Sequence, residues 1–156
     1  AIIDNSLENG YTVDWAADVS EPGFQYSKGF AVIPAGVGED AQNTEWSKWE
    51  TMSANSRRNM IANATEPIKE MEITQELRQQ GYDNYETTDD HGMLITGLYK
   101  DQNGNTFYKV KNSWNTDNIY DGYFFASAPF VAYKTLNIVV HKDAVPKDIR
   151  KKLGIK

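Results

Sequence analysis

The side chains in this sequence best suited to chemistry are one histidine and one asparagine. His91 opens an apolar stretch, and Asn112 follows the next such stretch, 21 positions later. An imidazole can take up or release a proton near neutral pH. An asparagine oxygen that accepts a hydrogen bond from one ring nitrogen fixes the tautomer and aims the other nitrogen at its reaction partner. The pair therefore predicts proton-transfer chemistry if the fold brings both residues together.

Two predicted β-strands position this pair. Residues 93–100 and 106–111 are rich in β-branched and aromatic side chains. Asn103-Gly104 lies between them and is a strong signal for a tight hairpin. His91 then begins the first strand and Asn112 ends the second, and antiparallel pairing brings those two ends together.

The same hairpin has a competing interpretation as a calcium loop, because Asp101, Asn103 and Asn105 alternate. An EF-hand needs glycine at its sixth position and an acidic residue at its twelfth. Thr106 and Asn112 occupy these positions, so the hairpin is preferred.

The rest of the chain predicts helices at both ends, a helical insert and further strands. We expect a short helix from residue 2 to Gly10, strands near 11–19, 29–34, 122–126 and 135–140, helical spacing over 44–63, a helix over 66–80 that Thr65 begins and Gly81 ends, and a final helix over 147–153. This order predicts an α+β fold whose antiparallel β-meander curves into a barrel-like sheet.

The residues around His91 and Asn112 resemble the papain family of cysteine peptidases. The motifs are Asp90-His91-Gly92-Met93, Lys111-Asn112-Ser113-Trp114 and Gly122-Tyr123. The resemblance implies that His91 and Asn112 are catalytic members of a Cys-His-Asn triad. It also implies that Trp114 shields the bond between them from water, with Asp90 as a supporting neighbour. Asn115 replaces the usual glycine after Asn-Ser-Trp, and asparagine tolerates positive φ better than most residues.

Residues 13–21 and 133–146 narrow the resemblance to the bleomycin hydrolase and aminopeptidase C branch, and within it to shorter bacterial relatives. The resemblance implies a papain-like fold in which residues 1–156 form the C-terminal, barrel-like half. The nucleophilic cysteine and an oxyanion-hole glutamine would belong to an absent N-terminal half, so this chain alone is expected to be inactive. In this branch a C-terminal tail confers exopeptidase action. The chain stops soon after its last helix, at Gly154-Ile155-Lys156, which leaves endopeptidase or dipeptidase action open.

The resemblance also implies partners and a location. We expect a peptide substrate, no cofactor, and association with the Cys-bearing half. Self-association is also expected, because removal of one half exposes an apolar face. The location implied is cytoplasmic, or periplasmic or exported if a preceding segment carries a signal.

Composition excludes several other classes. The chain has no cysteine, so disulfides and thiolate metal sites are excluded. Two histidines are too few for a His-built metal site, and Asp89-Asp90 beside His91 is a weak metal motif. The net charge is −6, although residues 134–156 hold seven basic side chains against two acidic ones. An acidic body argues against nucleic-acid binding. No apolar run approaches the roughly 20 residues of a membrane span.

Two alternatives compete with the catalytic interpretation. The chain would be a non-catalytic papain-like binding module, or pseudo-peptidase half, if the parent protein lacks the nucleophile. It would instead be an unrelated small β-barrel if His91 and Asn112 lie far apart. The second histidine, His141, follows a predicted strand and is interpreted as a strand-end residue.

Overall fold

The structure is a computed structural model that describes residues 1–35 and 45–155. The α-helices are α1 (Ile2–Glu8), α2 (Ala54–Ala62), α3 (Gln75–Asp83), α4 (Ala128–Lys134) and α5 (Lys147–Leu153). The strands are β1 (Val13–Ala17), β2 (Phe24–Gln25), β3 (Phe30–Ala31), β4 (His91–Lys100), β5 (Thr106–Lys111), β6 (Tyr123–Ser127) and β7 (Thr135–Val139). Short 3-10 helices are η1 (Tyr26–Lys28), η3 (Glu45–Thr51) and η4 (Lys142–Ala144).

The described strands form one seven-stranded sheet in the order β2-β3-β6-β5-β4-β1-β7. The mixed α+β class is therefore confirmed, and the observed sheet refines the expected curved or barrel-like antiparallel meander in two respects. β2 and β7 are free edges, so the sheet is not a closed barrel. β3 pairs with β6 in parallel. A parallel pair needs a long connection, and the chain between β3 and β6, which carries the insert and the β4–β5 hairpin, provides it.

The core lies on one face of this sheet and follows the two-residue period of its strands. Alternate side chains of the four central strands are buried on that face, namely Val13, Trp15, Ala17, Met93, Ile95, Tyr108, Val110, Phe124 and Ala126. Helix α4 adds Phe130 and Val131, and the Phe130 ring meets the Trp15 ring edge-on at 6.4 Å. The indole nitrogen of Trp15 donates to Thr135 Oγ1 at 2.7 Å, which satisfies the polar atom of this buried ring.

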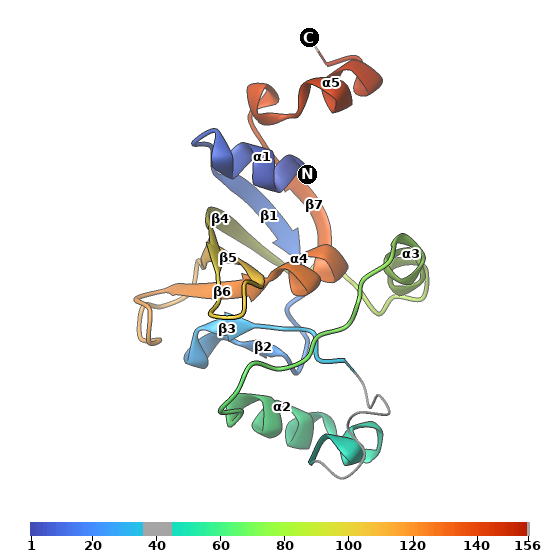
Figure 1. Ribbon diagram of the computed structural model, residues 1–156, viewed down its shortest axis with the longest axis vertical. Coiled ribbons are helices and arrows are strands. Elements are labelled where there is room, and N and C mark those ends of the chain that lie inside the picture. Colours follow the sequence, from blue (N-terminus) through green and yellow to red (C-terminus); the bar gives the residue numbers. More distant parts are fainter. Residues whose placement is uncertain (36–44, 156) are drawn as a thin grey trace.

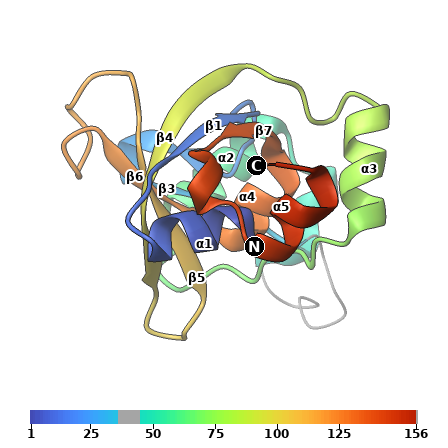
Figure 2. The ribbon, with the colours of Figure 1, turned by 90° about the horizontal axis from the view of Figure 1, so that it is seen from above.

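The remaining helices surround the sheet. Figure 1 shows α1 and α5 at the end where β1 and β7 lie, and α2 at the opposite end, beyond β2 and β3. Seen from above, α3 stands to one side of the molecule, away from the β4–β5 hairpin (Figure 2). None of the helices within residues 1–35 and 45–155 has the length and apolar composition of a membrane span.

The helix expected over residues 66–80 is wrong in its start and its end. Residues 69–71 are extended instead and lie beside residues 33–35, with hydrogen bonds from Ala35 N to Lys69 O (2.8 Å) and from Met71 N to Ile33 O (3.0 Å). Helix α3 starts later, where Thr74 Oγ1 accepts from Leu77 N at 3.1 Å. Long-range backbone pairing therefore overrides the local helix signals, which carry little free energy by themselves.

The other helices and the hairpin can be compared with the secondary structure expected from the sequence. Helix α4 was not expected, although Ser127 caps it through a hydrogen bond from Phe130 N at 3.1 Å. The expected helical stretch over 44–63 begins outside the described residues. From residue 45 onward it is confirmed as η3 and α2, which are separated where Ser53 caps α2. The expected β4–β5 hairpin and the terminal helices are confirmed, while residue 156 lies outside the described range.

Candidate active site

His91 and Asn112 meet because they stand on the same face of adjacent strands. His91 is the first residue of β4, and Asn112 directly follows β5. The register pairs Leu94 with Lys111, so Asn112 comes one step after the last pair and lies diagonal to His91. In the alternation of their strands, both residues point to the same face of the sheet as the buried core side chains. The His91 Nε2 atom lies 2.6 Å from Asn112 Oδ1. The expected juxtaposition is confirmed, and the alternative of an unrelated barrel with the two residues far apart is contradicted.

The surroundings of Asn112 define the tautomer of His91. The backbone N–H of Ser113 donates to Asn112 Oδ1 at 2.8 Å, which identifies this atom as the amide oxygen. Since an amide oxygen only accepts, His91 Nε2 carries the proton and donates it. The Nδ1 atom of the neutral ring is therefore the basic nitrogen. The backbone also holds Asn112, whose N–H donates to Gly122 O at 3.0 Å.

The amide nitrogen of Asn112 is an exception to good hydrogen bonding. Asn112 is 7% exposed, and its Nδ2 group is buried without an acceptor among the described residues. A buried unpaired donor costs about 1–3 kcal/mol. A side chain that carries this cost while its oxygen holds an imidazole is organised for that imidazole more than for stability.

Trp114 lies beside the His91 ring. Its ring centroid lies 4.8 Å from that of His91, and the two rings are tilted by 38°. Phe24 and Tyr26 hold the indole edge-on, at 5.8 and 5.2 Å. Trp114 is still 48% exposed, so one side of its ring faces solvent. The expected position of Trp114 next to the histidine is therefore observed.

Asp90 lies next to His91 but is directed at another segment. Its carboxylate accepts hydrogen bonds from the backbone of Val19 at 2.9 Å and from the Ser20 hydroxyl at 2.5 Å. It therefore fastens the chain just before His91 to residues 19 and 20. Within the described residues, no three His, Asp or Glu side chains gather in a group that could hold a metal ion.

A loop after Trp114 contributes a residue that the sequence did not single out. Asn118 is 8% exposed, and its Nδ2 group donates to Tyr26 O (3.1 Å) and Tyr123 O (2.6 Å). Its Oδ1 atom accepts from the backbone of Tyr120 at 3.3 Å and of Gly122 at 2.7 Å. Asn118 thus fastens this loop to η1 and to β6. An asparagine inside a polar loop gives no signal in the sequence that would reveal this role.

The turn around Asn115 differs from expectation. Positive φ among described non-glycine residues occurs only at Tyr85 and Asp121, so Asn115 does not adopt it. The left-handed backbone is instead at Asp121 (φ 52°) and Gly122 (φ 88°). The Asn115 carbonyl accepts a hydrogen bond from the Tyr26 hydroxyl, which fixes the segment after Trp114.

The second histidine is structural. The His141 ring stacks on Tyr11 with centroids 5.1 Å apart. Its Nδ1 atom accepts from Asp143 N at 3.3 Å and so caps η4. The interpretation of His141 as a residue just beyond a strand end agrees with this position.

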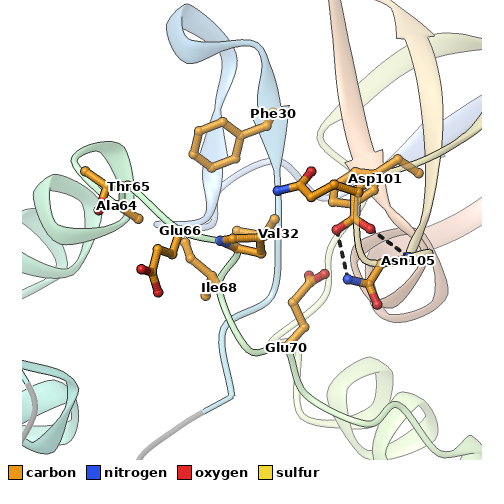
Figure 3. Close-up of a pocket in the computed structure, with 12 residues that line it drawn as sticks. Phe30, Val32, Ala64, Thr65, Glu66, Ile68, Glu70, Asp101 and Asn105 are labelled. Atoms are coloured by element: carbon orange, nitrogen blue, oxygen red, sulfur yellow. Dashed lines mark hydrogen bonds between the residues drawn. The ribbon is translucent and has the colours of Figure 1, made fainter.

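A pocket of about 310 Å³ lies at the other end of β4 from His91. Its walls combine apolar side chains, such as Phe30, Val32 and Phe107, with the carboxylates of Glu70 and Asp101. Figure 3 shows the Glu70 carboxylate pointing into the space beside Val32 and Ile68. Burial raises the pKa of Glu70 to about 7, although hydrogen bonds from Ser127 (2.5 Å) and the Ile33 backbone (2.7 Å) act in the opposite direction.

The fold and this site together define a class of protein. A model of the Peptidase C1-like family matches residues 45–155, which include His91, Asn112 and Trp114. The chain belongs to the Peptidase C1-like family, and the resemblance to papain-type cysteine peptidases of the aminopeptidase C branch is confirmed.

Individual relatives agree with this assignment. The chain is 41% identical to aminopeptidase C of Lactococcus lactis subsp. cremoris over 59 residues, which is 37% of this chain and 14% of that protein. It is 33% identical to aminopeptidase C of Lactobacillus helveticus over 69 residues, covering 44% of this chain and 15% of that protein.

A solved structure shows the same fold. The crystal structure of PepW from Lactobacillus rhamnosis matches 99% of this chain and 29% of PepW, with a TM-score of 0.58 and 19% sequence identity. The chain thus spans less than a third of PepW, and its matches to the aminopeptidases cover about a seventh of their length.

Proposed function

We propose that this chain supplies the histidine and asparagine of a Cys-His-Asn triad in a cysteine peptidase. The observation that supports this most is the 2.6 Å contact between His91 Nε2 and Asn112 Oδ1 beneath the Trp114 ring. This contact leaves Nδ1 as the basic nitrogen. The chain itself has no thiol that could face it. Because the 156 residues contain no cysteine, the nucleophile in this proposal comes from a Cys-bearing half.

The proposed reaction is acyl transfer to sulfur. His91 Nδ1 accepts the thiol proton, and the resulting thiolate attacks the peptide carbonyl carbon. The imidazolium then gives this proton to the leaving amine as the C–N bond breaks, which leaves a thioester. In the second half, Nδ1 takes a proton from water while hydroxide attacks the thioester, and it returns that proton to the departing sulfur.

The other site residues act on His91. Asn112 holds the ring orientation and stabilises the imidazolium, because its oxygen accepts from Nε2 in both charge states. Trp114 keeps water from competing for that bond. Asp90 holds the backbone before His91. The substrate proposed is a peptide, and the relatives named aminopeptidase C favour the removal of N-terminal residues.

The test is complementation with a Cys-bearing half. We expect the mixed halves to react with an epoxide-type thiol inhibitor and to hydrolyse a fluorogenic peptide. His91→Ala should abolish hydrolysis, whereas His141→Ala should not, since His141 caps a 3-10 helix. A correctly folded assembly that neither reacts with the inhibitor nor hydrolyses peptide would overturn the proposal. Peptide binding without hydrolysis would favour a non-catalytic binding module.

We further propose that the chain associates with the Cys-bearing half, or with itself when that half is missing. Several large apolar side chains are exposed: Trp114, which lies beside His91, and Ile119 and Tyr120, in the loop that follows it, are 48%, 64% and 45% accessible. Exposed apolar groups of this size favour contact with another surface. Gel filtration over a range of concentrations tests this, and a monomer that persists at high concentration would contradict self-association.

A further inference from the structure

Lys134, the last residue of α4, places its ammonium group in the protein interior. The residue is 1% exposed. Its Nζ atom forms ion pairs with Asp18, at 3.6 Å, and with Glu21. It also donates to Glu86 O at 2.7 Å and to Thr87 Oγ1 at 3.3 Å. A lysine is almost never fully buried unless it is paired, because desolvation of an unpaired charge is costly. This ammonium is paired on several sides.

The partners of Lys134 come from two loops that adjoin the His91 strand end. Asp18 and Glu21 follow β1, while Glu86 and Thr87 precede β4. Ala17, the last residue of β1, pairs with His91, the first residue of β4. The Lys134 ammonium therefore links the segment that follows Ala17 to the segment that precedes His91.

Further hydrogen bonds extend this connection to the residue beside His91. The Asp18 carboxylate accepts from Thr88 N at 3.2 Å and from Ser20 N at 2.8 Å. Asp90 in turn accepts from Val19 N and the Ser20 hydroxyl. The loop over residues 18–21 is thus fastened to the loop over 86–90 at both ends.

Charge explains why a cation is needed at this point. The two loops carry five acidic residues, Asp18, Glu21, Glu86, Asp89 and Asp90, of which Asp18 is buried. Like charges repel, and the repulsion is largest where solvent is excluded. Asp18 is 3% exposed, so without Lys134 it would be a buried, unpaired carboxylate. Loss of the cation would therefore weaken the connection between the two loops at the strand end that carries His91.

We propose that Lys134 is a positioning residue for His91: its buried ammonium joins the loops on either side of the Ala17–His91 pair and thereby holds the imidazole against Asn112. The catalytic meaning of this role rests on the proposed peptidase function. The positioning itself does not, because it can be measured on this chain without any reaction.

The experiment observes the histidine ring nitrogens by ¹⁵N NMR in the full 156-residue chain. The chain has two histidines, so His141 serves as an internal control in each spectrum. The variants are Lys134→Met, which keeps length and removes charge, and Asp18→Asn/Lys134→Met, which neutralises both members of the buried pair. Lys100→Met, on the exposed hairpin, makes the same change in net charge and is the matched control. Thermal unfolding is measured for each variant.

The wild-type chain and Lys100→Met should show one His91 tautomer, protonated at Nε2. In Lys134→Met, both tautomers should appear, and the Nε2 proton should exchange with water at least about tenfold faster, as expected for loss of a hydrogen bond of ordinary strength. The His141 signals should not change. In the double variant, thermal stability should largely return, since no buried charge is left unpaired, but the His91 changes should persist.

Two results would overturn the proposal. One is a Lys134→Met chain that is less stable but keeps the wild-type His91 tautomer and exchange rate. The other is a double variant in which the His91 signals return together with stability.

If Lys134→Met does not fold, the double variant decides alone. If neither folds, Glu21→Gln, which keeps Lys134 paired with Asp18, must still accelerate exchange at His91 and leave His141 unchanged. Failure of peptide hydrolysis in complementation would leave these spectra unaffected, so the two proposals fail separately.

Discussion

The Nε2 atom of His91 lies 2.6 Å from Oδ1 of Asn112, although 21 positions separate the two residues in the chain. The contact follows from the β4–β5 hairpin, which returns the chain to the strand end where it began. It defines a single neutral tautomer of His91 and leaves Nδ1 as the basic nitrogen.

The first prediction concerns Asn112 as the orienting residue. Asn112→Ala removes the acceptor of the His91 Nε2 proton, so ¹⁵N NMR should show a mixture of His91 tautomers in place of one. In the assembled peptidase, kcat should fall by about 10²-fold or more, the usual contribution of a positioned acid–base group. Asn103→Ala, on the exposed hairpin turn, is the control. An unchanged tautomer in Asn112→Ala would contradict the role assigned to this bond.

The second prediction compares two buried asparagines. Asn118 uses both donors and accepts twice, whereas the Nδ2 group of Asn112 is buried without an acceptor. Asn118→Ala should therefore lower the free energy of unfolding by about 2–3 kcal/mol. Asn112→Ala should cost less, because it also removes an unsatisfied group. Urea unfolding of both variants provides the comparison, and the reverse order would show that this assessment of the two amides is wrong.

The third prediction concerns Trp114 as a cover. Trp114→Ala should expose the His91–Asn112 bond to water and accelerate exchange of the His91 Nε2 proton, because the ring that lies 4.8 Å from the imidazole is removed. Trp114→Phe keeps an aromatic face and should show an intermediate rate. Since Trp114 is 48% exposed, stability should fall by only about 1–2 kcal/mol. Equal exchange rates in wild type and Trp114→Ala would rule out shielding.

The fourth prediction concerns Glu70 at the opposite end of β4. Burial raises its pKa from 4.5 to about 7, so the folded state prefers the protonated carboxyl. The contribution of Glu70 to the free energy of unfolding is therefore fully present below about pH 4.5. It is lost as pH rises through 7, and the total loss is on the order of 3 kcal/mol. Glu70→Gln imitates the protonated form and keeps one oxygen as acceptor, so it should remove this loss.

The measurement for Glu70 is thermal or urea unfolding between pH 4.5 and 8. Glu66→Gln provides the matched control, because Glu66 lines the same pocket but is exposed. That variant should keep the wild-type dependence on pH. A Glu70→Gln chain that loses stability with pH as the wild type does would contradict the assignment of this titration to Glu70.

The sequence by itself determined the site more completely than the fold. His91 and Asn112 could be placed together because strand signals on both sides of Asn103-Gly104 define a hairpin, and a hairpin fixes which ends meet. The resemblance of the motif after Asn112 to the papain family implied that Trp114 lies beside them. These inferences succeeded because they depend on residues that are near in the chain and on the period of a strand.

The tertiary structure decided what depends on distant partners. Residues 69–71 extend beside residues 33–35 despite helix signals, because backbone pairing across the fold outweighs small local propensities. The parallel β3–β6 pair and the open edges of the sheet arise in the same way. Lys134 gives the clearest case. In the sequence it belongs to a basic tail, but in the fold its ammonium is buried between two acidic loops beside His91, because only the packed chain brings those loops to the end of α4.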